Sequence, residues 1–278
     1  MTVYRGSSDS LWDEVDHQIL VHFSDGAPRT DAWGCPIGAT HVSDYLREGR
    51  SRFALIVREV LATGHHGRVL EVGSAYGATL LALKRLGFPD TGADHPASVA
   101  TYGEPLVKAG IDVAAWNIHT EDGVLPEFSF DVVICAEVLE HLQMSIRSAV
   151  TKLARLLLPG GSLILTTPNL RRLSNFAHLL SGRNIIEPFP DQPSTQNGVV
   201  VDRRAHPREP VMGELVAAME ENNLSVVHRT GFNNTTGLRG FRAVFWTLTP
   251  SSLRQHLLVR GKKGHGSRSD MSGRPCSG

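Results

Sequence analysis

The chain has 278 residues, which is enough for one large α/β domain with additions or for two small domains. Its 28 lysines and arginines balance 28 aspartates and glutamates, so its net charge does not favour nucleic acid or an anionic membrane as a partner. The polar start of the chain, the lack of a long apolar run and three scattered cysteines argue against a signal peptide, a membrane span and a disulfide framework. We therefore expect a soluble, cytoplasmic protein.

The first segment, residues 1–64, is expected to form a helical arm or lid. Turn residues at 26–28 and 34–36 interrupt its first forty residues, for which no element is predicted. Ser43 can cap a helix that runs to about Ala62, because apolar residues recur along it at helical spacing.

The next segment, from Arg68, alternates strand and helix patterns. Strands are predicted at 68–72, 90–94, 111–116, 130–135 and 162–167, and helices near 76–87, 97–109 and 143–157. Strands separated by helices imply right-handed βαβ units and a parallel sheet that is covered on both faces. The nearly continuous apolar runs of two of the strands agree with burial on both faces.

The chain after residue 167 departs from this rhythm. Residues 168–209 contain an amphipathic helix at 170–180 and a Pro/Gly/Asn-rich stretch, and they are expected to cover a substrate site. A helix ending near Asn222 and strands at 224–229 and 241–248 follow, within a domain assigned to 65–260. The tail at 261–278 is rich in Gly, Ser, Lys and Arg, and we expect it to be disordered.

The most informative segment is the turn from Arg68 to Gly77, where Glu71 precedes the glycine pair Gly73 and Gly77. Gly73 permits close approach of backbone and ligand, and Gly77 permits tight packing of helix against strand. Turns that bind dinucleotides have a third glycine and hold a pyrophosphate. A carboxylate at the strand tip suits a cationic ligand better than a phosphate.

Further motifs follow this turn in order: Gly92-Ala-Asp94, the segment 130–142, the Pro-Gly-Gly turn at 159–161 and the strand end at 166–169. With these motifs the central hundred or so residues resemble the class I S-adenosylmethionine-dependent methyltransferases, in their small-molecule branch. The resemblance implies a Rossmann-like α/β fold. Its sheet would have seven mostly parallel strands, with helices on both faces and an antiparallel last strand, here 241–248, beside 162–167.

The resemblance also implies a cofactor, S-adenosyl-L-methionine, and the residues that hold it. Asp94 would accept both ribose hydroxyls and Glu71 would act on the amino acid end, directly or through water. Asn117 and Ile118 would contact the adenine, although relatives usually have an acid where Asn117 stands, and Ile118 could equally be a core residue. The remaining cofactor residues are those of the turn and of the strand end at 136: Gly73, Ser74, Ala75, Gly77 and Ala136.

The catalytic candidates are His141, Glu137 and His206. Glu137 and His141 follow the strand at 130–135, where a parallel sheet places its ligand, and a histidine can act as a base near neutral pH. His206 lies in the segment expected to cover the acceptor. These residues could equally order loops. No metal site is predicted, since no ligand pair has a convincing spacing.

The predicted reaction is methyl transfer to a small molecule, with oxygen the preferred acceptor. One alternative is a protein on the same fold that binds the cofactor without transferring its methyl group. A nicotinamide-dependent oxidoreductase is a weaker alternative, because the third glycine and a tyrosine four residues before a lysine are missing. The sequence predicts neither nucleic acid nor membrane as a partner and leaves the oligomeric state open.

Overall fold

The computed structural model describes residues 8–25, 29–30, 36–120, 125–186, 195–196, 199–200, 206, 208–234, 246 and 248–265. The helices are α1 Ser8–Phe23, α2 Ala39–Leu61, α3 Ala78–Arg85, α4 Pro96–Tyr102, α5 Glu104–Lys108, α6 Ile146–Leu156, α7 Leu173–Leu180 and α8 Met212–Glu221. The strands of the main sheet are β3 Val69–Val72, β4 Asp90–Asp94, β5 Asp112–Ala115, β6 Phe130–Ala136, β7 Leu157–Pro168, β10 Leu224–Phe232 and β11 His256–Lys263. Two short pairs, β1 Arg29–Thr30 with β2 Pro36–Ile37 and β8 Thr195–Gln196 with β9 Val199–Val200, lie outside it.

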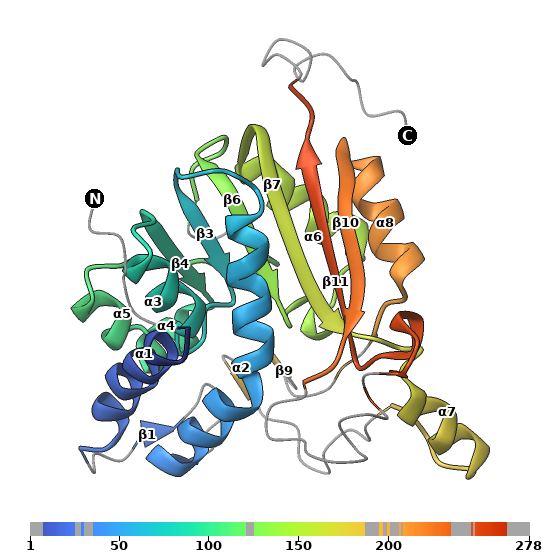
Figure 1. The fold of residues 1–278 in the computed structure, drawn as a ribbon, viewed down its shortest axis with the longest axis horizontal. Helices are drawn as coiled ribbons and strands as arrows, with labels where there is room; N and C mark the ends of the chain where they lie inside the picture. The colour runs from blue at the N-terminus through green and yellow to red at the C-terminus, as the bar shows by residue number, and fades with distance from the viewer. Residues whose placement is uncertain are drawn as a thin grey trace.

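The main sheet has seven strands in the order β10-β11-β7-β6-β3-β4-β5. Neighbours among β3 to β7 pair in parallel, whereas β11 runs antiparallel to both β7 and β10. Figure 1 shows β7 and β10 pointing toward the lower edge of the molecule and β11 pointing away from it. This is the predicted Rossmann-like sheet, and its five parallel strands overlap the five segments that were predicted for them.

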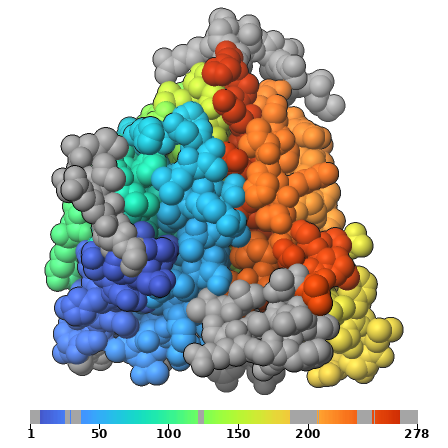
Figure 2. Space-filling view, viewed as in Figure 1, coloured from blue at the N-terminus to red at the C-terminus, as the bar shows by residue number. Residues whose placement is uncertain are grey.

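Helices cover both faces of the sheet. One core cluster joins residues of α1, α2 and α3 to Val132 and Ile134 of β6, and the other joins α6 and α8 to Val133 and Cys135. Alternate residues of one strand thus enter opposite cores, as the two-residue repeat of a strand requires. Helix α2 crosses in front of the sheet in Figure 1, and Figure 2 shows α1, the start of α2 and α7 along the same lower edge.

The structure corrects the position of the last strand. The antiparallel strand beside β7 is His256–Lys263, whereas 241–248 was predicted. Residues 241–245 and 247 lie outside the described residues, and residues 246 and 248 are helical. Strand β11 also extends three residues into the predicted tail, of which residues 266–278 lie outside the described residues.

Two further differences concern the N-terminal arm. Helix α1 occupies a segment for which the sequence predicted no element, and α2 begins at Ala39 rather than at Ser43. Gly38, in extended conformation, precedes α2 without a side-chain cap. Over the part of the chain that the structure covers, no helix is both long and apolar enough to cross a bilayer.

Candidate functional site

The glycine turn after β3 is held in a left-handed backbone conformation. Gly73, Ala75 and Gly77 have φ angles of 76°, 44° and 75°. The Gly73 amide donates to the Ala93 carbonyl at 2.8 Å, and the Gly77 amide donates to the Ser74 carbonyl at 2.7 Å. Ala75 accepts a conformation that favours glycine, which costs about 1 kcal/mol. A glycine at position 75 would adopt this conformation without that cost.

Asp94 fastens this turn to the tip of β4. Its Oδ2 accepts a hydrogen bond from the Ala75 amide at 3.0 Å, and its Oδ1 accepts one from the His95 amide at 2.7 Å. Both carboxylate oxygens of Asp94, at the tip of β4, thus accept from backbone amides. Asp94 therefore orders the backbone of the turn, a role that the sequence did not reveal.

Glu71 is a buried carboxyl at the tip of β3. Its side chain is 5% exposed, and its Oε2 accepts no hydrogen bond from any described residue. Burial raises the pKa of the Glu71 carboxyl to about 8. A small cavity of about 20 Å³ adjoins it, lined also by Gly73, Ser74, Ala136 and side chains of α2. That volume suits one water molecule or one ammonium group.

Asn117 and Ile118 follow β5, which pairs with β4 up to Asp94. Asn117 Oδ1 accepts a hydrogen bond from the His119 amide at 2.9 Å, so the side chain orders its own loop. Ile118 is 7% exposed and packs in the core cluster on the α6 side of the sheet. Both lie at the expected edge, and their contact with an adenine ring remains a prediction.

Glu137 follows β6 with a φ angle of 54° and is the centre of a polar network. Its Oε1 accepts a hydrogen bond from the Thr166 hydroxyl at 3.0 Å, and its Oε2 lies 2.9 Å from His256 Nδ1 and 3.7 Å from Arg52 Nη1. Burial acts to raise the pKa of the Glu137 carboxyl, but the hydrogen bond and charge of His256, with Arg52, outweigh it and lower that pKa. Glu137 is therefore held as an ionised, structurally engaged carboxylate.

A second cluster joins the two other catalytic candidates. His141 ends a short 3-10 helix, Leu139–His141, and its ring meets the His206 ring edge to face with centroids 4.8 Å apart. His206 Nδ1 lies 3.1 Å from Glu209 Oε1, and Arg172 pairs with the other oxygen of Glu209. Burial acts to raise the pKa of the Glu209 carboxyl, and its bonds to His206 and Arg172 outweigh burial and lower it.

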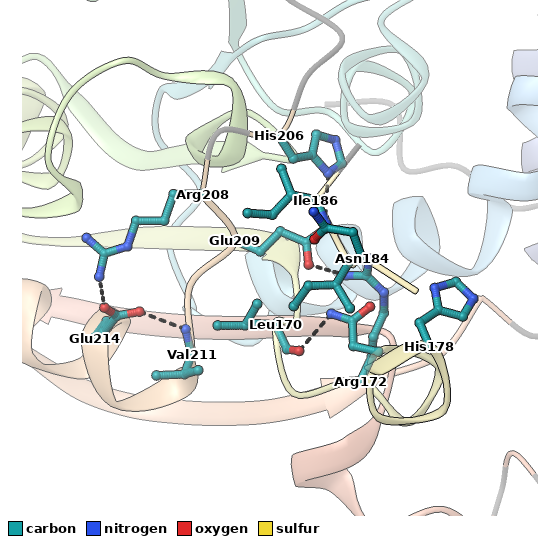
Figure 3. Close-up of a pocket in the computed structure, with 12 residues that line it drawn as sticks. Leu170, Arg172, His178, Asn184, Ile186, His206, Arg208, Glu209, Val211 and Glu214 are labelled. Carbon is teal, nitrogen blue, oxygen red and sulfur yellow. Dashed lines mark hydrogen bonds and ion pairs between the residues drawn. The ribbon is translucent and has the colours of Figure 1, made fainter. Parts of the chain in front are cut away.

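A larger cavity of about 660 Å³ lies beside this histidine pair, between α7 and the start of α8. Figure 3 shows His206, Glu209 and Arg172 on its wall, and Arg208 turned toward Glu214. Its apolar wall is formed by Leu170, Ile185, Ile186 and Val211. Because Arg172 and Arg208 are both paired with glutamates, the wall offers an apolar surface and imidazole nitrogens rather than a cluster of unpaired cations.

The structure brings the predicted residues together in three groups. Glu71, Gly73, Ser74 and Ala136 line the small cavity, Asp94 binds the amide of Ala75, and His141 contacts His206. Glu137 instead contacts Thr166, His256 and Arg52.

Sequence reasoning missed the partners of these residues, chiefly Arg52, His256 and Glu209. Arg52 had a signal, because it stands seven residues after Tyr45 on the apolar side of α2, where a lone charge needs a partner. No local pattern pointed to His256.

Comparison with known proteins gives a family and two curated relatives. A family described as a methyltransferase domain matches residues 40–229. The ubiquinone biosynthesis O-methyltransferase of Colwellia psychrerythraea is 26% identical over 176 residues, covering 61% of this chain and 66% of the relative. The protein of the same name from Alkalilimnicola ehrlichii is 31% identical over 125 residues, covering 44% of this chain and 50% of the relative. The matches thus span less than two thirds of either relative.

Solved structures share the fold. A phosphoethanolamine N-methyltransferase of Haemonchus contortus, determined with phosphomonomethylethanolamine and S-adenosylhomocysteine, superimposes with a TM-score of 0.55 at 12% identity. The superposition covers 83% of this chain and 62% of that one. At this identity the likeness establishes the fold alone.

Proposed function

The chain belongs to the class I S-adenosylmethionine-dependent methyltransferase family, and from this premise we propose that it methylates an oxygen atom of a small molecule. The observation that carries the proposal is the contact of His141 with His206 beside the cavity of about 660 Å³. A hydroxyl that accepts a methyl group must lose its proton, and imidazoles are suited to that step near neutral pH.

The residues at the glycine turn fit the cofactor. Glu71 offers a buried oxygen that accepts no hydrogen bond from the described residues, beside a cavity the size of an ammonium group, which suits the charged amino group of S-adenosylmethionine. The carboxylate of Asp94, which fixes the turn, lies at the tip of β4, where it would accept the ribose hydroxyls. The carboxyl of Glu71 favours a sulfonium cofactor over a dinucleotide, whose pyrophosphate would lie against it, whereas Asp94 would suit the ribose of either cofactor.

A cofactor held by Glu71 and Asp94 would supply an electrophilic methyl group on a sulfonium, whose sulfur–carbon bond would break as the carbon–oxygen bond forms, leaving a neutral thioether. The protein must align the acceptor oxygen with that bond and remove the hydroxyl proton. His141 and His206 would receive the proton, and Glu209 would hold the His206 ring in place through its Nδ1. The wall of the cavity of about 660 Å³ would hold the acceptor oxygen in line with the sulfur–carbon bond.

The wall of the cavity supports a proposal for the class of acceptor. Leu170, Ile186 and Val211 would contact an apolar part of the acceptor, while the histidines meet its hydroxyl. The two curated relatives are named as O-methyltransferases, which supports oxygen over nitrogen. A phenol or alcohol with an apolar substituent is the acceptor that these features fit best.

The test is a product assay with the purified chain. S-adenosylmethionine is supplied with matched phenols, alcohols and amines, and mass spectrometry follows S-adenosylhomocysteine and the methylated product. We expect O-methylation, with turnover lowered about 100-fold in His141→Ala and in His206→Ala while cofactor affinity is kept. Methyl transfer to amines alone would overturn the choice of oxygen. Tight cofactor binding without methyl consumption on any acceptor would favour a binding protein.

The cofactor is also expected to displace about one proton when it binds near pH 7. Glu71 is largely neutral in the free protein, because burial raises its pKa to about 8. An ammonium group beside it favours the carboxylate, so affinity should rise as the pH increases from 6 to 8. In the free protein, the stability that neutral Glu71 contributes is complete below about 4.5 and is lost as the pH rises through about 8.

Calorimetry in two buffers with different ionisation enthalpies measures this proton release. Glu71→Gln should release no proton, whereas Glu48→Gln, which changes an exposed carboxyl on α2, should behave like the wild type. Equal proton release in Glu71→Gln and the wild type would contradict the placement of the ammonium group.

A further inference from the structure

Three side chains with metal-binding donor atoms converge between the end of β6 and the large cavity that His206 lines. Glu140 and His141 come from the 3-10 turn after β6, and His206 comes from the segment before α8. One donor atom of each lies within 4.8 Å of the donor atoms of the other two. We propose that Glu140, His141 and His206 bind one divalent transition-metal cation, which holds the acceptor oxygen at an open coordination position.

The donor set indicates the kind of cation. Two imidazoles and one carboxylate are the protein ligands of many catalytic zinc sites, in which a fourth position stays open for water or substrate. Mg²⁺ and Ca²⁺ prefer sites built only from oxygen donors. Tetrahedral Zn²⁺ with bonds of about 2.1 Å would bring the donor atoms to about 3.4 Å from one another. From 4.8 Å or less, this needs only modest side-chain rotation.

The surroundings orient two of the three ligands. Glu209 engages His206 through Nδ1, which leaves Nε2 as the nitrogen for a cation, and Arg172 anchors Glu209 in turn (Figure 3). The Thr167 hydroxyl donates to Glu140 Oε2 at 3.1 Å. Metal-bound histidines characteristically have a carboxylate or carbonyl on their other nitrogen, which fixes the ring. The His206–Glu209 pair has this arrangement.

The charge around Glu140 also favours a cation. Its side chain is 1% exposed, and among the described residues no lysine or arginine forms an ion pair with it. Arg52 acts on Glu140 through its charge without forming an ion pair, whereas a divalent cation would lie directly against the carboxylate. If Glu140 only filled space in the core, a neutral side chain of similar shape would serve equally well.

The metal site itself does not depend on the proposed function, but its role with the acceptor does. A cation next to the acceptor would lower the pKa of the acceptor hydroxyl, so that the proton leaves to solvent water before the oxygen takes the methyl group. In the metal-bound protein His141 and His206 would hold the cation, and this step would replace the direct proton transfer to their rings that the proposed function describes. The cation itself undergoes no redox change in this step.

The first test measures metal binding to the full chain without cofactor. Protein stripped with a chelator is titrated with Zn²⁺ against a chromophoric competitor and with Co²⁺ by visible absorption. We expect one equivalent to bind, with affinity reduced at least 100-fold and the Co²⁺ bands lost in Glu140→Gln, His141→Ala and His206→Ala. Glu209→Gln should weaken binding about 10- to 100-fold. His178→Ala, which removes another histidine of the same cavity, should keep metal affinity.

Cofactor affinity and circular dichroism show that each variant is folded. The proposal is overturned if the wild type binds no stoichiometric Zn²⁺ or Co²⁺, or if all three ligand variants bind as tightly as the wild type. A second arm separates it from the proposed function. Methylation that persists in a chelator, without metal binding, would leave only the O-methyltransferase standing. Metal binding without methylation of any hydroxyl would leave the cation site and remove its role with the acceptor.

Discussion

Replacing Gly73 with valine is expected to abolish measurable binding of S-adenosylmethionine, a loss of at least 100-fold or about 3 kcal/mol. A Cβ at this position would lie 2.2 Å from Val138 Cγ2, and φ is 76°, where a branched side chain is strained. The chain must then shift at the turn that adjoins both Glu71 and the small cavity. Calorimetry with the cofactor and with S-adenosylhomocysteine measures the loss.

The matched control is Gly110→Val. Gly110 has a φ of 72°, but a Cβ there would have no atom within 4 Å, so this variant reports the backbone strain alone. It should lose about 1–2 kcal/mol of stability and keep cofactor affinity. Gly73→Ala combined with Val138→Ala removes the clash while the Cβ remains. Wild-type affinity in Gly73→Val would refute the assignment of the turn.

The parallel half of the fold could be predicted because its signals are local. The strands at 130–135 and 162–167 are nearly continuous apolar runs, as burial on both faces requires, and the others are short segments set off by turns and helices. Helix α1 also had a signal, since Leu11, Val15, Ile19 and Phe23 recur every four residues and are all buried. Polar residues between them obscured the pattern.

The last strand could not be predicted, because its polar residues are satisfied only by tertiary contacts. Strand β11 reads as a basic tail after Val259, yet Arg260 meets Glu59 of α2 at 3.1 Å. Lys263 Nζ donates to the carbonyls of Ala154 and Leu157 at 2.7 and 2.9 Å. The aromatic stretch at 241–248 resembled a strand more closely. Propensity alone gave the wrong choice between the two.

The residues of the candidate site also fall into those that local sequence signals predict and those that only tertiary contacts bring together. Glu71, Gly73 and Asp94 lie at strand ends, so the parallel topology alone places them at one edge. By contrast, Glu137 meets Arg52 from 85 residues earlier and His256 from 119 residues later, and no local pattern encodes these contacts. Glu137 was predicted as a catalytic group, whereas its contacts tie α2, β6 and β11 together at the cofactor edge.

This network leads to the second large effect: Glu137→Gln is expected to lower the free energy of unfolding by about 3 kcal/mol. The substitution keeps the size of the side chain but removes its charge, and the Arg52 side chain, 13% exposed, would lose its anionic partner at 3.7 Å. Removing one member of a buried ion pair leaves the other charge uncompensated. Urea unfolding at pH 7 measures the change.

A double-mutant cycle separates the ion pair from other effects of the substitution. Arg52→Met should cost less stability in the Glu137→Gln background than in the wild type, because the cation it removes has by then lost its carboxylate partner at 3.7 Å. Glu48→Gln, at the exposed Arg47 pair on the same helix, should change stability by less than about 0.5 kcal/mol. Additive effects of the two buried substitutions would show that Arg52 and Glu137 are not coupled. In that case His256 and Thr166, rather than Arg52, would be what holds Glu137 at the tip of β6.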